Sequence, residues 1–477
     1  MFNKYFRFIT NSSTIMTWFS LGAKPISFIL LLPLILTRFS KEEIALWYLF
    51  STFISLQALA DFGFYNTFVR LISYSLSGGC NSAQDLVKIE NTNRQVGTPN
   101  LKLAGEIVGT MSYIYNWLTL AAIIVLICCS PLLSHGINST ENIGEGWLAW
   151  SFIILGTTIN FAGRKFSNFL LGQNEVALIR KWEGIFAIAA LVSNIFVVYM
   201  FKSLLLLVFT NQIWLVINFF RNRYLANNNT KLSFRDFRIF KFNKEIFTIA
   251  WPLAWKSGVS SVCSEGTAYS SGIFYAQYGN SAQIGIYLIA LRIIVIIRTF
   301  SLAPFYSKIP LLSYLRGKND IKKWENTAQQ SMLLANMVMV IGIISFSIIG
   351  KYYFTIIKSN ISFPDNTLWL LLGFAFMLHR YGAMHTQLYS TLNKVNSHIS
   401  DIISSIIMFA FWFAFYNRFG ILVFPYGMIV SYLSFYVWYS GYFSYKHINI
   451  SPLKFEYKAN LLPFTLLFLY FLVIIIF

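Results

Sequence analysis

Residues 284–314 read IGIYLIALRIIVIIRTFSLAPFYSKIPLLSY, and this stretch decides the fold class. Its first part is an apolar run, and a run of about 20 such residues is enough to cross a membrane as a helix. The run contains Arg292 and Arg298 and is followed by a proline-containing segment. Ionisable side chains are costly inside a spanning helix, so these arginines point to function as well as to membrane location.

The rest of the chain has the same character. Of its 477 residues, 56% are hydrophobic and only 12% are charged, which is about half the charged fraction of soluble domains. This composition excludes a disordered chain, a disulfide scaffold, and a soluble enzyme or nucleic-acid binder, despite the net charge of +19. The sequence predicts an all-α polytopic membrane protein with 12 transmembrane helices and an additional C-terminal segment, at 14–37, 44–72, 107–129, 147–170, 182–201, 203–220, 246–275, 281–306, 328–350, 367–392, 398–416, 421–445 and 461–477.

The 37 Lys and Arg residues are distributed unevenly between the connections. If the N-terminus is cytoplasmic, most of them fall in cytoplasmic connections, above all in 221–245, and few fall in outer ones. Cytoplasmic loops of membrane proteins carry such an excess of basic residues. The sequence therefore predicts a multi-pass protein with a cytoplasmic N-terminus, in which 221–245 is either an amphipathic helix on the inner leaflet or a plain basic loop.

An internal repeat divides the chain. Residues 44–48 resemble residues 284–288, and residues 64–74 resemble residues 305–314. In both halves of the chain, these two segments follow a span that contains proline. Because an even number of spans separates them, the repeat is parallel, as in transporters built from two helical bundles. We expect two six-helix bundles and four regions: an N-terminal bundle at 1–222, a basic cytoplasmic linker at 223–245, a C-terminal bundle at 246–445, and a C-terminal tail at 446–477.

Three groups of motifs carry a family resemblance: Gly285-Ile286-Tyr287 with Leu291-Arg292, Pro310, Leu312-Ser313 and Gly317; Asp61-Phe62-Gly63-Phe64 with Arg70; and Phe169-Leu170-Leu171-Gly172-Gln173. With these motifs and its six-plus-six layout, nearly the whole chain resembles Wzx-type O-antigen or polysaccharide flippases. That family belongs to the multidrug/oligosaccharidyl-lipid/polysaccharide (MOP) exporter superfamily. The additional C-terminal segment departs from the usual pattern of the family and leaves the side of the C-terminus open.

The resemblance implies a function in polysaccharide or lipopolysaccharide biosynthesis. It implies movement of undecaprenyl-diphosphate-linked O-antigen or related repeat units from the cytoplasmic to the periplasmic leaflet of the bacterial cytoplasmic (inner) membrane, by alternating access. The expected partners are the lipid-linked oligosaccharide and the bilayer, with a polysaccharide polymerase and a chain-length regulator as further candidates. No cofactor, metal or nucleic acid is expected.

Basic side chains inside the spans are the candidate substrate-binding residues. Lys24 and Lys256 each lie about 15 Å into corresponding spans of the two halves, and Arg292 and Arg298 are separated by about 120° around one helix. Arginine suits a diphosphate because its guanidinium makes paired contacts with phosphate oxygens. The candidates are Lys24, Lys256, Arg292, Arg298 and Arg380.

Acidic residues inside the spans are the candidates for ion coupling or gating. Asp61 and Glu265 lie nearer the two faces of the membrane, and Arg70 follows Asp61 in the same segment. On one straight helix, a separation of nine residues places Asp61 and Arg70 on opposite faces. The two could therefore form a pair only if they belong to different helices. His379 and His385 could carry protons, although single histidines in bundles more often bond to neighbouring helices.

Two other functions remain open at this stage. A cation-coupled multidrug exporter of the same superfamily would carry carboxylates, rather than Lys and Arg, deep in its cavity. A membrane polysaccharide polymerase or ligase would be an enzyme, but the sequence contains no nucleophile elbow, P-loop or metal-ligand spacing. We therefore expect a transporter and no enzymatic activity.

Overall fold

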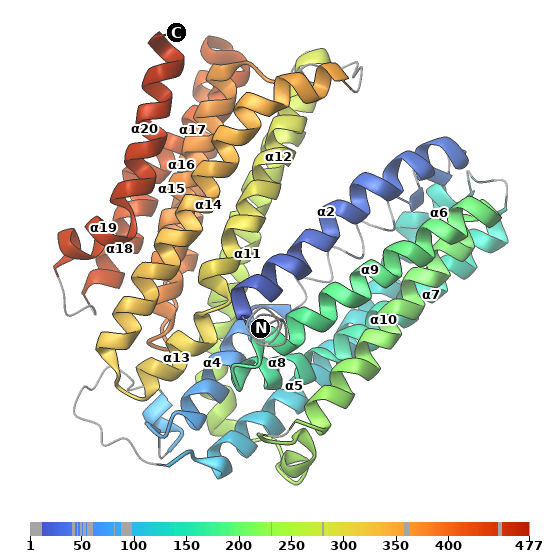
Figure 1. Ribbon diagram of the computed structural model, residues 1–477. Coiled ribbons are helices and arrows are strands. Elements are labelled where there is room, and N and C mark those ends of the chain that lie inside the picture. The colour runs from blue at the N-terminus through green and yellow to red at the C-terminus, as the bar shows by residue number, and fades with distance from the viewer. Residues whose placement is uncertain are drawn as a thin grey trace, which may run out of the picture. The chain divides into compact units, whose positions relative to one another are not determined.

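The structure is a computed structural model, and all the regular structure that it describes is helical (Figure 1). The all-α fold class predicted from the sequence is therefore confirmed. For some helical segments, including 23–29, 265–278 and 281–285, only the backbone is described. The described residues are 12–40, 43–44, 46–47, 50, 54, 61–80, 82–86, 98–138, 140, 142–229, 231–278, 281–356, 363–446 and 451–476.

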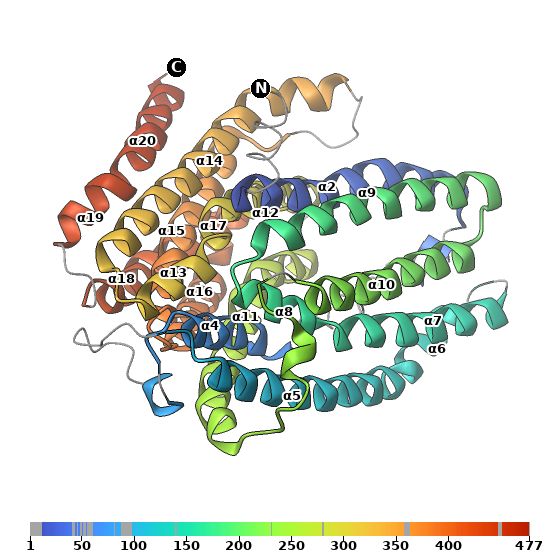
Figure 2. The ribbon, with the colours of Figure 1, turned by 60° about the horizontal axis from the view of Figure 1, so that its bottom comes forward.

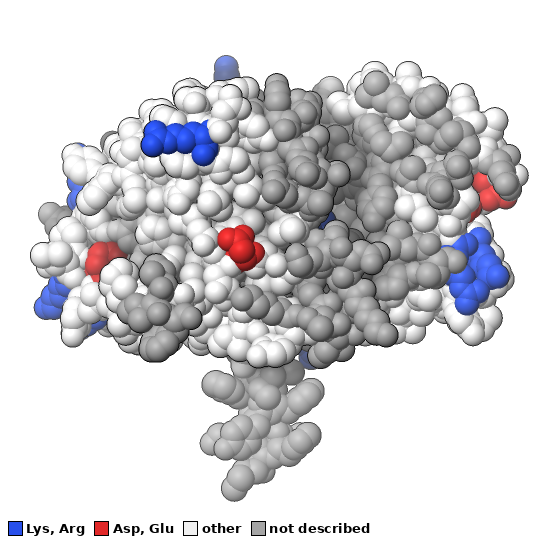
Figure 3. Space-filling model, turned by 90° about the horizontal axis from the view of Figure 1, so that it is seen from above, with Lys and Arg blue, Asp and Glu red and all other residues white. Residues whose placement is uncertain are grey.

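Many of these helices have the length and composition of membrane spans. Among the described residues, 7 helices are long and apolar enough to cross a membrane, or up to 8 if the pair at 452–474, bent by 60°, is one broken span. Large apolar side chains are exposed on them, such as Val192, Ile349 and Phe413. On the face shown in Figure 3, charged side chains are sparse among uncharged ones. The large apolar side chains exposed along these helices fit a lipid environment rather than water.

The chain forms two compact units that divide within α11 (Lys244–Tyr278), between Ala254 and Trp255. In the N-terminal unit, α2 lies along α9 and α7 lies along α10 (Figures 1 and 2). The apolar sides of these helices meet in a core that includes Trp150 and Leu207. The helices of this unit are α2 (Ser13–Arg38), α4 (Phe64–Leu76), η2 (Gln84–Leu86), α5 (Leu101–Cys128), α6 (Ser130–Asn138), α7 (Ile143–Ala162), α8 (Arg164–Gly172), α9 (Val176–Phe201), α10 (Leu204–Asn227) and η3 (Phe234–Phe237).

In the C-terminal unit, α12 packs against α14, α15 against α18, and α16 against α17. Trp369 and Trp412 are fully buried in its core. The segment expected as one span at 421–445 is interrupted by the π-helical turn η5, which lies between α17 and α18. The helices of this unit are the rest of α11, α12 (Ser281–Tyr306), α13 (Ile309–Gly317), α14 (Ile321–Ile356), α15 (Asn366–Ser390), α16 (Ser397–Phe419), η4 (Gly420–Leu422), α17 (Val423–Ser431), η5 (Tyr432–Tyr436), α18 (Val437–Tyr445), α19 (Pro452–Ala459) and α20 (Leu461–Ile476).

A helix junction recurs in both units. Between α8 and α9, Asn174 adopts φ 64°, and between α15 and α16, Asn393 adopts φ 58°. The backbone N–H of Asn174 donates to Leu171 and that of Asn393 donates to Ser390, at 2.8 and 3.0 Å. Asparagine is among the few residues other than glycine that adopt this left-handed conformation readily. The same turn chemistry at corresponding places supports the predicted internal repeat.

The basic segment at 221–245 differs from one of its two expected forms. It is not an amphipathic helix: α10 continues to Asn227, and of the residues described between there and α11 only the single turn of η3 is helical. Phe234 of this turn packs against Phe166 and Phe169 of α8, with ring centroids 4.8 and 5.3 Å apart. The phenylalanines therefore hold the segment against the N-terminal unit instead of forming a continuous apolar helix face.

Candidate functional site

A cavity of about 160 Å³ lies inside the C-terminal unit, where α11, α12, α15, α16 and the turn η5 approach one another. We call it the arginine cavity. Most of its lining side chains are polar, although the chain as a whole is 56% hydrophobic. The lining residues are Ser260, Ser261, Ser264, Arg298, Leu302, Tyr306, His379, Arg380, Ala383, Thr386, Gln387, Ser397, Asp401 and Tyr436.

Helix α15 contributes most of the lining because its polar residues share one face. Arg380, Ala383 and Gln387 follow a spacing of three and four residues, which places them one above another on an α-helix. Met377 and Met384, three and four residues from Arg380, are fully buried in apolar clusters. Arg380 therefore lies where the cavity-facing surface of α15 meets the apolar core.

Arg380 is buried, and its guanidinium has no hydrogen bond to any residue that the structure describes. Its side chain is 1% exposed, and none of its three guanidinium nitrogens has a hydrogen-bond partner among the described residues. A buried charge that is left unpaired destabilises a protein by several kcal/mol. A guanidinium forms strong, charge-assisted hydrogen bonds with anionic oxygens, so Arg380 is a candidate contact for an anionic substrate.

Arg298 brings a second guanidinium to the same cavity. It projects from α12, is 8% exposed, and places its Cζ atom 5.6 Å from the centre of the Phe376 ring. The one carboxylate of the lining, Asp401, accepts a hydrogen bond from the Ser260 hydroxyl. Two arginines and one aspartate leave the lining with a net positive charge.

An aromatic wall completes the cavity. The His379 ring stacks on Tyr436 with centroids 5.5 Å apart and an angle of 3° between the planes. The Nε2 atom of His379 lies 3.1 Å from the Ser264 hydroxyl oxygen. The π-helical turn that carries Tyr436 is a local irregularity of a kind that is frequent at functional sites. Gly382 allows α15 to approach the Tyr436 ring closely, since a Cβ at position 382 would lie 2.3 Å from that ring.

The predicted substrate-binding residues do not all meet in this cavity. Arg298 and Arg380 line it, whereas Lys256 is half-buried on α11 and does not. Arg292 is exposed on α12. It is separated from Arg298 by about 120° around the helix axis, so the two side chains lie in different surroundings. The side chains of Lys24 and Glu265 lie outside the described residues.

Asp61 and Arg70 belong to the N-terminal unit and do not form a pair. Asp61 accepts hydrogen bonds from the Tyr115 hydroxyl at 2.6 Å and from the Tyr65 backbone N–H at 2.8 Å. It also lies 3.5 Å from Arg164. Arg70 is buried in α4, and its Nε and Nη2 atoms have no hydrogen-bond partner among the described residues.

Sequence reasoning missed two acidic residues that the structure places inside the units. Asp401 lines the arginine cavity, and Glu183 of α9 pairs with Arg180 at 2.7 Å and accepts a hydrogen bond from Ser20 at 3.0 Å. Both lie near the predicted start of a span, where charged residues are ordinary. For Asp401 a usable signal existed: serines at 397, 400, 404 and 405 make the first turns of that span unusually polar.

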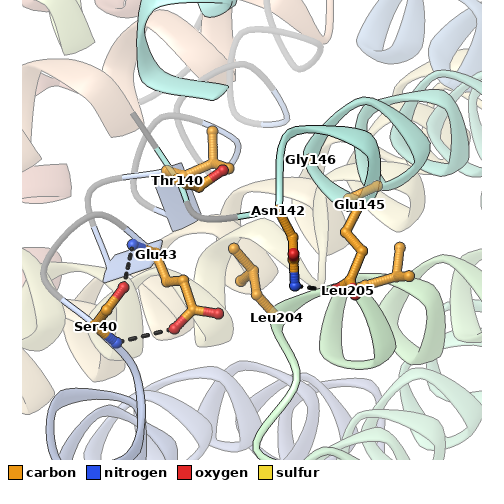
Figure 4. Close-up of a pocket in the computed structure, with 10 residues that line it drawn as sticks. Ser40, Glu43, Thr140, Asn142, Glu145, Gly146, Leu204 and Leu205 are labelled. Atoms are coloured by element: carbon orange, nitrogen blue, oxygen red, sulfur yellow. Dashed lines mark hydrogen bonds between the residues drawn. The ribbon is translucent and has the colours of Figure 1, made fainter. Parts of the chain in front are cut away.

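A smaller cavity of about 100 Å³ lies in the N-terminal unit (Figure 4). Two of its side chains, Glu43 and Glu145, are carboxylates, but both serve local turns. Ser40 and Glu43 exchange hydrogen bonds of 2.9 and 3.2 Å, and Asn142 donates to Glu145 at 3.4 Å. Reciprocal bonds of the first kind are a helix-capping motif. Among the described residues, no group of three or more His, Cys, Asp or Glu side chains could hold a metal ion.

Comparison with solved structures identifies the fold. A multidrug resistance MATE family transporter of the MOP superfamily, in an outward-facing conformation, matches with a TM-score of 0.71 at 14% sequence identity, over 92% of this chain and 96% of that chain. A MATE in the straight conformation matches with a TM-score of 0.70 at 15% identity, over 90% and 94% of the two chains.

A third match is a MOP superfamily transporter from Pyrococcus furiosus, described by the reverse polarity of its binding pocket and a different function that this suggests. Its TM-score is 0.70 at 13% identity, over 90% of this chain and 94% of that chain. No protein-family model matches the chain, and no curated protein matches it. The chain therefore has the transmembrane helical fold of MATE transporters of the MOP superfamily.

Proposed function

We propose that this protein is a flippase that moves an undecaprenyl-diphosphate-linked oligosaccharide, such as an O-antigen or related repeat unit, from the cytoplasmic to the periplasmic leaflet by alternating access. The transporter fold supports movement of a substrate across the membrane. The resemblance in sequence to Wzx-type flippases supports the substrate class.

The observation that carries the proposal is the buried guanidinium of Arg380, without a hydrogen bond to any described residue, beside Arg298 in one cavity. A diphosphate carries about two negative charges, and exposing it to hydrocarbon would cost far more than a transporter could supply. Fixed cations in the protein interior replace its hydration, because Coulomb attraction strengthens where the dielectric constant falls. Arginine adds paired hydrogen bonds to phosphate oxygens.

The other lining groups suit the sugar part of the substrate. Hydroxyl and amide groups from Ser261, Thr386 and Gln387 can donate and accept hydrogen bonds with sugar hydroxyls. The cavity therefore combines an anion-binding part with a part that tolerates neutral, hydroxyl-rich groups.

The second candidate is a cation-coupled multidrug exporter, and Asp401 in the same cavity is the observation in its favour. The excess of arginine over carboxylate favours an anionic substrate. The reversed pocket polarity stated for the Pyrococcus furiosus transporter indicates that pockets in this superfamily differ in sign. For a polysaccharide polymerase or ligase we have no structural observation in support.

The remaining parts of the proposal rest on the sequence. Lys24, Lys256 and Arg292 are proposed as further contacts for the diphosphate and for acidic sugars during passage. Asp61, Arg70 and Glu265 are proposed to act in ion coupling or gating. The bacterial inner membrane, a cytoplasmic N-terminus, and a polymerase and chain-length regulator as partners complete the proposal.

A cellular experiment tests the function. In cells that lack the protein, complete lipid-linked repeat units should accumulate on the inner leaflet, and surface polysaccharide should be lost. Wild-type protein should restore it, Arg380→Gln should not, and Arg418→Gln should, because Arg418 is exposed and packs over Phe419 away from the cavity. Protein abundance is measured for each variant. Accumulation on the outer leaflet would contradict the proposal and indicate a polymerase or ligase.

A further inference from the structure

A second cavity, open and of about 370 Å³, lies in the N-terminal unit where residues 231–243 pack against α5, α8 and α10. We call it the linker cavity. Three basic side chains from separate segments line it: Lys165 of α8, Arg223 of α10 and Arg238 of the linker. No Asp or Glu is among its lining residues. None of the three cations forms an ion pair with another described residue.

These three cations are held together despite their mutual repulsion. All three side chains line the same cavity, and the Lys165 ammonium donates a hydrogen bond to the neutral Asn116 side-chain oxygen at 3.0 Å. Surface lysines and arginines normally lie apart or next to carboxylates, since like charges close together destabilise a fold. A convergence of three without a carboxylate is favourable when an anion lies between them.

The other walls of the linker cavity are aromatic and firmly packed. Phe234 lies between Phe166 and Phe169, with ring centroids 4.8 and 5.3 Å away. Phe240 lies so close to α5 that a Cβ at Gly105 would be 2.3 Å from its ring. The linker is thus a built wall of the cavity and not a loosely attached loop.

The rim carries side chains typical of the membrane–water interface. On α5, next to the lining residue Ser112, Tyr113 and Trp117 are 46% and 57% exposed, and the Tyr113 ring contacts Phe242 at 4.8 Å. Trp and Tyr are enriched where a membrane protein passes the lipid headgroups. A basic cavity with such a rim is suited to the depth at which headgroup phosphates are found.

We propose that the linker cavity binds the headgroup phosphate of an anionic membrane phospholipid. The three cations receive the phosphate, and the phenylalanine walls receive the first part of the acyl chains. A soluble phosphate would use the charges but would leave the apolar walls empty, so the combination favours a lipid. This site is separate from the arginine cavity and does not depend on the proposed substrate.

The test is lipid binding to the purified protein in detergent, measured by native mass spectrometry and by the thermal shift that each lipid produces. Phosphatidylglycerol should bind and raise the melting temperature. Arg238→Gln should weaken this binding about five-fold, and Lys165→Gln with Arg238→Gln about 25-fold, as expected for roughly 1 kcal/mol per basic residue near a charged membrane surface. Arg238→Lys should retain most of the binding.

Arg235→Gln is the matched control, because Arg235 is also exposed in the same linker but does not line the cavity. It should bind phosphatidylglycerol as the wild type does. The proposal is overturned if phosphatidylcholine with the same acyl chains binds equally, which would mean apolar binding only. It is also overturned if inorganic phosphate alone gives the full thermal shift, or if Arg238→Gln and Arg235→Gln behave alike.

Discussion

Replacing Arg380 by Met should make the protein more stable and at the same time a much slower transporter. Arg380 is 1% exposed, and its three guanidinium nitrogens have no hydrogen-bond partner among the described residues. Exchange of buried charged groups for apolar ones of similar volume is often neutral or stabilises by about 1–4 kcal/mol. Because 1 kcal/mol shifts the melting temperature of a unit of 150–250 residues by about 2–4 °C, we expect a rise of about 2 °C or more.

Transport should change in the opposite direction. A hydrogen bond to a charged group contributes about 1.5–3 kcal/mol, so loss of the guanidinium should slow export of the lipid-linked oligosaccharide roughly ten- to a hundred-fold. Melting is followed by the fluorescence of the purified protein during heating, and export by surface polysaccharide. Arg418→Met is the control and should change both values little. A large fall in the melting temperature of Arg380→Met would refute the reasoning, because it would show that Arg380 stabilises the fold.

Three further predictions concern other parts of the two units. Asp401→Asn should raise the apparent affinity for the anionic substrate, measured by its transport at low concentration, because the carboxylate repels it; loss of transport would instead favour a cationic substrate. Asp61→Asn and Tyr115→Phe should each lower the melting temperature. A double-mutant cycle of the two should give a coupling energy of about 0.5–3 kcal/mol, and additive effects would contradict a hydrogen bond between the two side chains. Gly109→Ala should destabilise by about 2 kcal/mol and expose the linker to trypsin, because a Cβ there would lie 2.5 Å from a linker carbonyl oxygen; Gly144→Ala, with nothing within 4 Å, should not.

The fold class was predictable because the composition and the apolar runs act over whole helices. Depth along a span was also predictable at about 1.5 Å per residue, which is why Arg298 and Arg380 were singled out. Depth does not give the direction in which a side chain points on a packed helix. For that reason Arg292, on the same span, was grouped with Arg298 although it is exposed.

Local packing accounts for what the sequence did not reveal. The π-helical turn that places Tyr436 over His379 leaves no periodic signature, since one extra residue per turn looks like ordinary apolar sequence. By contrast, the sequence does contain a signal for the packing of the linker against α5. Gly105 and Gly109 are four residues apart, and small residues at that spacing permit close approach of another backbone.

The most direct test of the central claim is translocation by the purified protein in liposomes. A short lipid-linked oligosaccharide with a diphosphate bridge is incorporated into both leaflets, and a membrane-impermeant glycosidase reports the fraction that reaches the outside. With the wild-type protein, we expect the inner-leaflet fraction to become accessible much faster than in protein-free liposomes. If the rate equals that of protein-free liposomes while the same preparation moves an organic cation, the account of an anion-carrying cavity is contradicted.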